Sequence, residues 1–298
     1  MSVLETQIIG RAAQRTGAGT GAHWGRLILY LTAIAVAVVF MLPFLWTVGS
    51  SLKTSVDVRQ FPPALFPANP RFQNYVDIWN VVPLAQFFWN SVKVTGLALT
   101  GQLVSATLVA YGFARFRFPL RDALFMLVIS TILLPREVVI IPTFLLFKTL
   151  GWLDTLLPLI VPSFFGGGAF TIFLLRQFFL TLPRELDEAA KIDGANSFQV
   201  LIRVLVPLAR PALATAAIFA FLGHWNDFLE PLIYLNSSKN FTVALGLRYF
   251  QTLPNESQEP REQLLMAATL VVTLPVLIIF FAAQRYFVRG IVMTGIKG

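Results

Sequence analysis

Long apolar runs with few charges constrain this chain more than any other feature of its sequence. A helix needs about 20 apolar residues to cross the hydrocarbon core of a bilayer. Runs of this length lie at 27–50, 89–113, 122–147, 155–180, 211–235 and 264–284. Only 13% of the residues are charged, whereas a soluble domain carries about 25%. The sequence therefore predicts an all-α membrane protein with six transmembrane helices.

The side-chain chemistry removes several function classes. The chain has no cysteine, which excludes a disulfide framework, a thiolate metal site and a cysteine nucleophile. Its two histidines, His23 and His224, provide little material for a metal site or for acid–base catalysis. No G-x-x-x-x-G-K-[ST] phosphate loop occurs, so the chain cannot itself be an ATPase. We expect no catalytic residues, no bound metal and no cofactor on this chain.

The net charge of +8 predicts an orientation in the membrane rather than binding to nucleic acid. Segments 1–26, 114–121, 181–210 and 285–298 carry thirteen Lys and Arg over 78 positions, and the other connections carry seven over 73. Connections rich in Lys and Arg stay on the cytoplasmic side. We therefore expect both termini to be cytoplasmic.

The runs and their connections predict the organisation of the chain. Residues 1–26 are expected to form a disordered cytoplasmic tail, and they do not fit a cleaved signal peptide because the apolar run that follows is too long. Helix 27–50 is expected to be a peripheral addition, followed by an external loop at 51–88. The helical core then occupies 89–284, and 285–298 form a cytoplasmic tail.

A polar segment, 181–207, separates the fourth and fifth apolar runs. Pro183 suits the first turn of a helix, where its missing N–H is not needed. Glu185, Asp187 and Glu188 then fall in early turns, where the helix dipole favours negative charge. The spacing predicts a short helix on the cytoplasmic face.

A second short helix is expected in the same segment. Gly194 stands where the end of a helix favours a residue that can adopt positive φ. Asn196 or Ser197 can cap the next helix, which Pro207 closes. Residues 181–207 are thus predicted to form a helix–turn–helix.

Two interpretations of the 181–207 segment follow from the residues alone. It is either a plain amphipathic linker at the membrane interface or a close-fitting contact for a partner. The small side chains of Ala189 and Ala190 beside Glu188 favour the contact, because a surface linker has no need of small residues.

The spacing within this segment resembles the EAA loop of ABC importer permeases. The resemblance is carried by Glu188, Ala189, Ala190, Gly194, Val204, Val206 and Pro207. The family pattern has isoleucine and leucine where this chain has Val204 and Val206, so both positions stay apolar. Further motifs at 174–179, 192–195, 225–228 and 284–290 resemble the carbohydrate-uptake branch, which includes the second permeases of maltose-type and glycerol-phosphate-type transporters. The resemblance covers residues 27–298.

The resemblance implies the fold and partners of a type I ABC importer permease in a bacterial inner membrane. It implies a second homologous permease, two cytoplasmic ATPase subunits that hold ATP and Mg, and an external solute-binding protein. The EAA loop would be a coupling helix seated in a cleft of the ATPase. Glu188 would make a polar contact there, Ala189 and Ala190 would pack closely, and Gly194 would make the turn. Residues 294–298 would approach the ATPase dimer.

Polar residues cluster in the fifth run. They are His224, Trp225, Asn226, Asp227 and Glu230. Ionisable groups in a membrane segment are costly and tend to face a cavity or a partner. This cluster therefore either lines a pathway for a hydroxyl-rich solute or lies hydrated in the outer headgroup region.

Two other features allow simpler interpretations. Arg136 and Glu137 follow Pro135 in the third run, as a charge pair near the outer interface or at a helix break. The glycines at 166–168 indicate close helix packing or a hinge.

The sequence thus predicts the permease subunit of an ATP-driven ABC importer for a sugar, oligosaccharide, polyol or glycerol phosphate. The alternatives are an ABC permease for a non-sugar solute, such as a peptide or ion, and an ion-driven secondary transporter. A membrane enzyme would need a convergent catalytic set, which two distant histidines do not provide.

Overall fold

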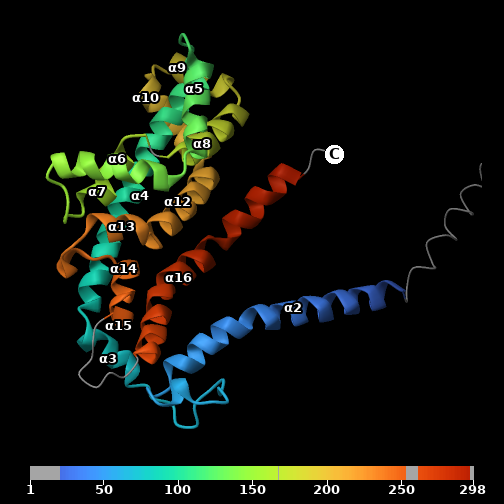
Figure 1. Cartoon of the computed structure of the whole chain (residues 1–298). Coiled ribbons are helices and arrows are strands. Elements are labelled where there is room, and N and C mark those ends of the chain that lie inside the picture. Colours follow the sequence, from blue (N-terminus) through green and yellow to red (C-terminus); the bar gives the residue numbers. More distant parts are fainter. Residues whose placement is uncertain (1–20, 167, 253–260, 296–298) are drawn as a thin grey trace, which may run out of the picture.

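The computed structural model describes residues 21–166, 168–252 and 261–295, and these residues form helices and turns without a strand (Figure 1). The α-helices are α2 (Gly21–Ser51), α3 (Asn74–Val81), α4 (Leu84–Arg115), α5 (Arg121–Ser130), α6 (Arg136–Thr149), α7 (Leu157–Ile160), α8 (Ala169–Thr181), α9 (Glu185–Ile192), α10 (Ser197–Val200), α11 (Val206–Leu208), α12 (Arg210–Trp225), α13 (Leu229–Tyr234), α14 (Val243–Leu247), α15 (Tyr249–Thr252) and α16 (Glu262–Gly295). The all-α prediction is confirmed.

Four helical segments of the described residues are long and apolar enough to cross a bilayer. They are Gly25–Ser51, Leu84–Arg115, Leu157–Thr181 and Glu262–Gln284. Two further pairs of helices also qualify if each bent pair counts as one span. Four to six candidate membrane helices make this a multi-pass membrane protein.

The predicted span 122–147 contains a sharp bend. The structure divides it into two helical segments, Arg121–Leu133 and Arg136–Thr149, which meet at an angle of 101°. Leu134 and Pro135 between them are extended. Proline explains the break, because its ring excludes the preceding residue from helical geometry.

The predicted span 211–235 is also interrupted. Helix α12 ends at Trp225 and α13 begins at Leu229. Pro231 cannot donate to the carbonyl of Asp227, and its ring would clash there in a continuous helix. A second bend, of 81°, separates Ser197–Leu208 from Arg210–Tyr234.

The fourth run bends at its glycines. A 3₁₀ turn, Val161–Phe164, ends before Gly166, and α8 begins after Gly168. Gly166 and Gly168 have φ of +105° and +76°, which side chains with a Cβ rarely adopt. These two glycines therefore change the direction of the chain, and Gly167 lies outside the described residues.

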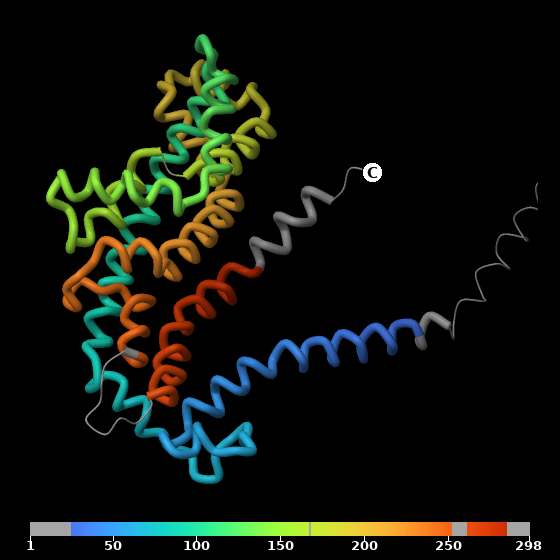
Figure 2. Tube along the Cα trace, viewed as in Figure 1, coloured from blue at the N-terminus to red at the C-terminus, as the bar shows by residue number. Residues whose placement is uncertain are grey.

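Helices α2 and α16 extend away from the rest of the bundle (Figures 1 and 2). Helix α2 contacts α16, and the described side chains of its first part are exposed. It begins at Gly21, so residues 21–26 are helical rather than part of a disordered tail, and residues 1–20 lie outside the described part. Helix α16 continues to Gly295, beyond the predicted end at 284. The predicted ATPase-directed residues 296–298 are not described.

Helix α4 is the centre of the bundle. It contacts α8, α12 and α14 and carries small buried residues that let neighbouring helices approach closely, such as Ala98, Ala106 and Ala110. At Gly101 a Cβ would lie 2.4 Å from the Phe164 ring, so only glycine fits. Buried apolar side chains form two clusters, one around the first half of α4 and one around its second half.

Asp154 ties two connections together at the end of the molecule that carries α13 and α14. Its carboxylate accepts hydrogen bonds from the backbone N–H groups of Asn236, at 3.0 Å, and Ser237, at 2.7 Å, and from the Ser237 hydroxyl. The Asp154 N–H donates to the Tyr234 carbonyl at 2.8 Å. The bond from the Ser237 hydroxyl, with the backbone bonds, lowers the pKa of Asp154 to about 2.

We expect Asp154→Ala to lower the stability of this end, because it leaves two backbone N–H groups without their charged acceptor. Hydrogen bonds to charged groups contribute about 1–3 kcal/mol, and partial exposure places this effect at the lower end. Thermal unfolding in detergent measures the change. The folded pKa is lowered, so the contribution is present above pH ~4 and is lost only as the pH falls through about 2. Asp77→Ala, which removes an exposed ion pair with Arg71, should change little, and equal effects would contradict this role.

Candidate functional site

The 181–207 segment folds as a helix–turn–helix at one end of the molecule (Figure 1). Helix α9 begins at Glu185 with acidic residues in its first turn, where the dipole favours them. The sequence predicted Pro183 in the first turn of this helix, but Pro183 lies two residues before its start at Glu185. Gly194 has a φ of +85°, as predicted for the turn.

Asn196, not Ser197, caps the second helix. Its side chain accepts a hydrogen bond from the Gln199 N–H at 2.9 Å, and the Gln199 side chain accepts one from the Asn196 N–H at 2.9 Å. The chain continues through a π-helical turn, Leu201–Leu205, into α11. Pro207 therefore does not close this helix, because the wide π-helical turn before it accommodates the missing N–H. The helix bends only after Leu208.

The predicted coupling residues divide between two environments. Glu188 and Ala189 are exposed on α9, as are the apolar Ile192, at 87%, and Phe198, at 62%. Ala190 and Val206 pack against the apolar cluster around the second half of α4, and Val204 and Pro207 are half-buried. An exposed surface with apolar side chains and a carboxylate is suited to contact with another protein.

One acidic residue of α9 points the other way. Asp187 is buried, and its Oδ2 lies 3.0 Å from Nε of Arg115 at the end of α4. From the sequence, Asp187 was predicted only to lie in an early helical turn, where the helix dipole favours negative charge. No local pattern shows which of three acidic side chains turns inward, because the answer depends on where α4 ends.

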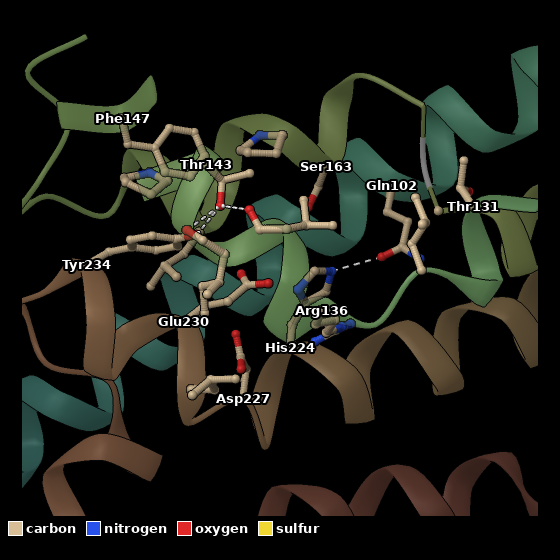
Figure 3. Close-up of a pocket in the computed structure, with 18 residues that line it drawn as sticks. Gln102, Thr131, Arg136, Thr143, Phe147, Ser163, His224, Asp227, Glu230 and Tyr234 are labelled. Carbon is tan, nitrogen blue, oxygen red and sulfur yellow. Dashed lines mark hydrogen bonds between the residues drawn. The ribbon is translucent and has the colours of Figure 1, made fainter. Parts of the chain in front are cut away.

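A cavity of about 610 Å³ is lined by both polar and apolar side chains (Figure 3). Its walls come from α4, α6, α12, α13 and the turn before α8. Polar groups on these walls are Gln102, Thr131, Arg136, Thr143, Ser163, His224, Asp227, Glu230 and Tyr234. Residues just after the breaks in the third and fifth runs, Arg136 and Leu229, belong to the lining of the cavity.

Hydrogen bonds order the cavity wall. Gln102 donates through Nε2 to Thr171 Oγ1 at 2.9 Å, so its Oε1 accepts from His224 Nε2 at 2.8 Å. This network places the imidazole proton on Nε2. The Thr143 hydroxyl and the Tyr234 hydroxyl are 2.9 Å apart.

The charged side chains come from facing helices. Figure 3 shows Asp227 and Glu230 from the α13 side and Arg136 from the start of α6. Carboxylates accept hydrogen bonds from hydroxyl groups, and a guanidinium donates them. Tyr234 and Phe147 add aromatic surface, with ring centroids 5.1 Å apart. The arrangement can hold a solute rich in hydroxyl groups.

The structure brings together three of the five predicted pathway residues. His224, Asp227 and Glu230 line the cavity, but Trp225 and Asn226 do not. The Trp225 indole is buried and donates through Nε1 to the Val272 carbonyl of α16 at 3.2 Å. Its neighbour Asn226 is exposed and donates to the Leu222 carbonyl at 3.0 Å. Adjacent helical residues point about 100° apart, so Trp225 does not share the cavity face with His224, and Asn226 lies after the end of α12.

Arg136 is the main cavity residue that sequence analysis did not assign to a solute. An ionisable residue in an apolar run was the available signal. Its neighbour Glu137 does not line the cavity. Within the described residues, no group of three His, Cys, Asp or Glu is arranged to hold a metal ion.

Comparisons with known proteins agree with these features. Residues 102–293 match the family described as binding-protein-dependent transport system inner membrane component. The chain is 35% identical to the lactose transport system permease protein LacG of Rhizobium radiobacter, over 89% of this chain and 94% of that protein. It is 34% identical to the sn-glycerol-3-phosphate transport system permease protein UgpE of Brucella melitensis, over 91% and 95% respectively. Identity is 32% to YurM of Bacillus subtilis, a probable ABC transporter permease, over 94% and 89%.

A solved structure has the same fold. It is a chain of a bacterial ABC transporter involved in the import of the acidic polysaccharide alginate, with a TM-score of 0.79 and 24% identity over 91% of this chain and 98% of that chain. The resemblance to ABC importer permeases is thus confirmed. This chain belongs to the family of binding-protein-dependent transport system inner membrane components, as a multi-pass permease.

Proposed function

We propose that this chain is the permease subunit of an ATP-driven ABC importer for a carbohydrate or related solute, which an external binding protein delivers. The observation that carries the proposal is a cavity with charged groups within an apolar bundle. The Glu230 carboxylate of α13, the Asp227 carboxylate of the connection before it and the Arg136 guanidinium of α6 line this cavity beside aromatic rings. Relatives named for lactose and for sn-glycerol-3-phosphate support this solute class.

In this proposal the energy comes from other subunits. Two ATPases hold ATP and Mg on the cytoplasmic side, where both termini of this chain also lie. The exposed Glu188 and Ala189 contact an ATPase, and Gly194 fixes the turn. A second permease completes the pathway in a bacterial inner membrane, and the exposed side chains of α2 face lipid or that permease. ATP and the loaded binding protein then each favour one state of a two-state transporter.

Reconstitution into liposomes tests the function directly. The chain, its second permease and the ATPases are combined with the cognate binding protein, and lactose, glycerol and sn-glycerol-3-phosphate are added in turn. We expect at least one of these to stimulate ATP hydrolysis and to enter the liposomes only with ATP. Uptake by this chain alone on an ion gradient, without ATP, would establish a secondary transporter instead.

We expect Gly194→Val to damage the turn before α10. A β-branched residue at φ +85° is strained by about 1–3 kcal/mol, although the position has open space around it. ATPase co-purification or solute-stimulated hydrolysis should fall several-fold while insertion into the membrane continues. Gly96→Val, at an exposed helical position that also has space, is the control. Unchanged transport in Gly194→Val would refute the coupling assignment.

We expect Glu188→Lys to weaken ATPase docking by reversing a charge at the exposed surface of α9. A loss of about 1–2 kcal/mol corresponds to a roughly five- to thirty-fold weaker association. Co-purified ATPase and solute-stimulated hydrolysis measure the effect. Glu185→Lys, an equal change in the same turn of α9, controls for the helix dipole. If both readouts stay normal in Glu188→Lys, Glu188 has no docking role.

A further inference from the structure

A buried ion pair joins the 181–207 segment to the end of α4. Arg115 Nε lies 3.0 Å from Asp187 Oδ2, and the two side chains are only 7% and 12% exposed. Arg115 also donates through Nη2 to the Leu182 carbonyl at 3.1 Å. The Arg115 guanidinium therefore contacts both the connection before α9, at Leu182, and α9 itself, at Asp187.

This ion pair is a poor device for stability alone. Burial raises the pKa of Asp187, and Arg115 opposes this shift. Asp187 Oδ1 and Arg115 Nε are buried without a hydrogen-bond partner among the described residues, so the charges are close but not fully satisfied. Apolar side chains of similar volume often replace a buried ion pair without loss of stability. The contact is better explained if the ion pair holds α9 in one position relative to the end of α4.

Tyr111 provides a second attachment one turn earlier on α4. Its hydroxyl donates to the Ser197 carbonyl at the start of α10, at 3.0 Å. Residues four apart lie on the same face of a helix, so Tyr111 and Arg115 present one surface. The Tyr111 ring is wedged edge-on against Phe116 and Phe179. Both helices of the 181–207 segment are thus attached to one face of α4.

The other parts of α4 reach the cavity and the opposite end of the bundle. Gln102 holds His224 at the cavity wall. Gln86 and Asn90 donate to the Lys239 carbonyl, each at 2.8 Å, and the Ser91 hydroxyl accepts from the Val243 N–H at 2.8 Å. Helix α4 has 32 residues with no proline inside and is about 48 Å long. It is an uninterrupted helix, whereas the third and fifth runs are broken (Figure 1).

We propose that Arg115 and Tyr111 form a clamp with Asp187 and Ser197 that makes α4 move with the 181–207 segment, and that α4 carries this movement to the cavity through Gln102. Arg115, Asp187 and Tyr111 are positioning residues, because they contact neither solute nor ATPase in the proposed arrangement. The inference rests on the proposed function, in which α9 docks on an ATPase. The clamp acts after docking, so its loss separates ATP hydrolysis from transport.

Variants that remove one charge test the clamp in the reconstituted complex with its binding protein. Asp187→Asn and Arg115→Gln each remove one charge and leave Glu188 exposed for docking. We expect the ATPases to co-purify at wild-type levels and the solute taken up per ATP hydrolysed to fall about tenfold. The double reversal R115D/D187R should recover at least a third of the wild-type ratio. The exposed pair Arg71 and Asp77 is the matched control, and R71Q/D77N should leave the ratio unchanged.

Tyr111→Phe tests the clamp without a change of charge, in case a charge variant reduces the yield of folded subunit. It removes the hydrogen bond to Ser197 and keeps the aromatic packing. We expect a two- to fivefold fall in uptake per ATP with a normal unfolding midpoint. A wild-type ratio in Tyr111→Phe and in the better-folded charge variant would overturn the clamp.

The outcome for Glu188→Lys separates failure of the clamp from failure of the coupling assignment. Weak docking in Glu188→Lys, together with normal uptake per ATP in Asp187→Asn, would reject the clamp and retain the proposed function. Normal docking in Glu188→Lys, with ATP-independent uptake, would reject the proposed function itself, and the clamp with it.

Discussion

The structure depends on close packing along one unbroken helix, α4. In a membrane, apolar side chains gain little from leaving lipid for protein, so helix association relies on close van der Waals contact and on internal hydrogen bonds. Gly101 and the buried alanines of α4 provide the first, since the Phe164 ring lies where a Cβ at Gly101 would be. Asn90, Gln102 and Tyr111 provide the second, each bonded to a distant part of the chain. Helices α3, α5, α7, α8, α12 and α14 all contact this helix.

The breaks in the third and fifth runs line a cavity, whereas the unbroken α4 packs closely against its neighbours. A backbone that leaves helical geometry inside a bilayer is tolerated where it lines a cavity or is buried in protein. The break at Pro135 and the one between Trp225 and Leu229 both meet this condition, because residues just after each of them line the same cavity. The prolines that prevent straight spans therefore lie directly beside two charged residues of the cavity lining, Arg136 and Glu230. A rigid central helix and broken neighbours together allow a cavity with charged groups in an apolar bundle.

Local features of the sequence were predictable, and positions set by tertiary packing were not. Gly194 and the Asn196 cap follow from short-range backbone rules, and the apolar runs follow from composition. Trp225 was predicted to belong to the solute pathway because an indole can stack on a sugar, but helical geometry turns it toward α16. Arg136 and His224 are far apart in the sequence, and only the bend at Pro135 brings their elements to one cavity. The inward turn of Asp187 likewise depends on where α4 ends.

The acidic residues of α9 show how one short helix can serve two contacts. Glu188 and Asp187 are adjacent, so their side chains point about 100° apart. Glu188 is exposed, and Asp187 is buried against Arg115. An ion pair of an exposed carboxylate contributes little free energy, because water solvates both charges well. A buried carboxylate that loses its counter-charge is strongly destabilising. The buried contact with Arg115 therefore fixes α9 against the end of α4, while the Glu188 carboxylate stays exposed on the other side of the same helix.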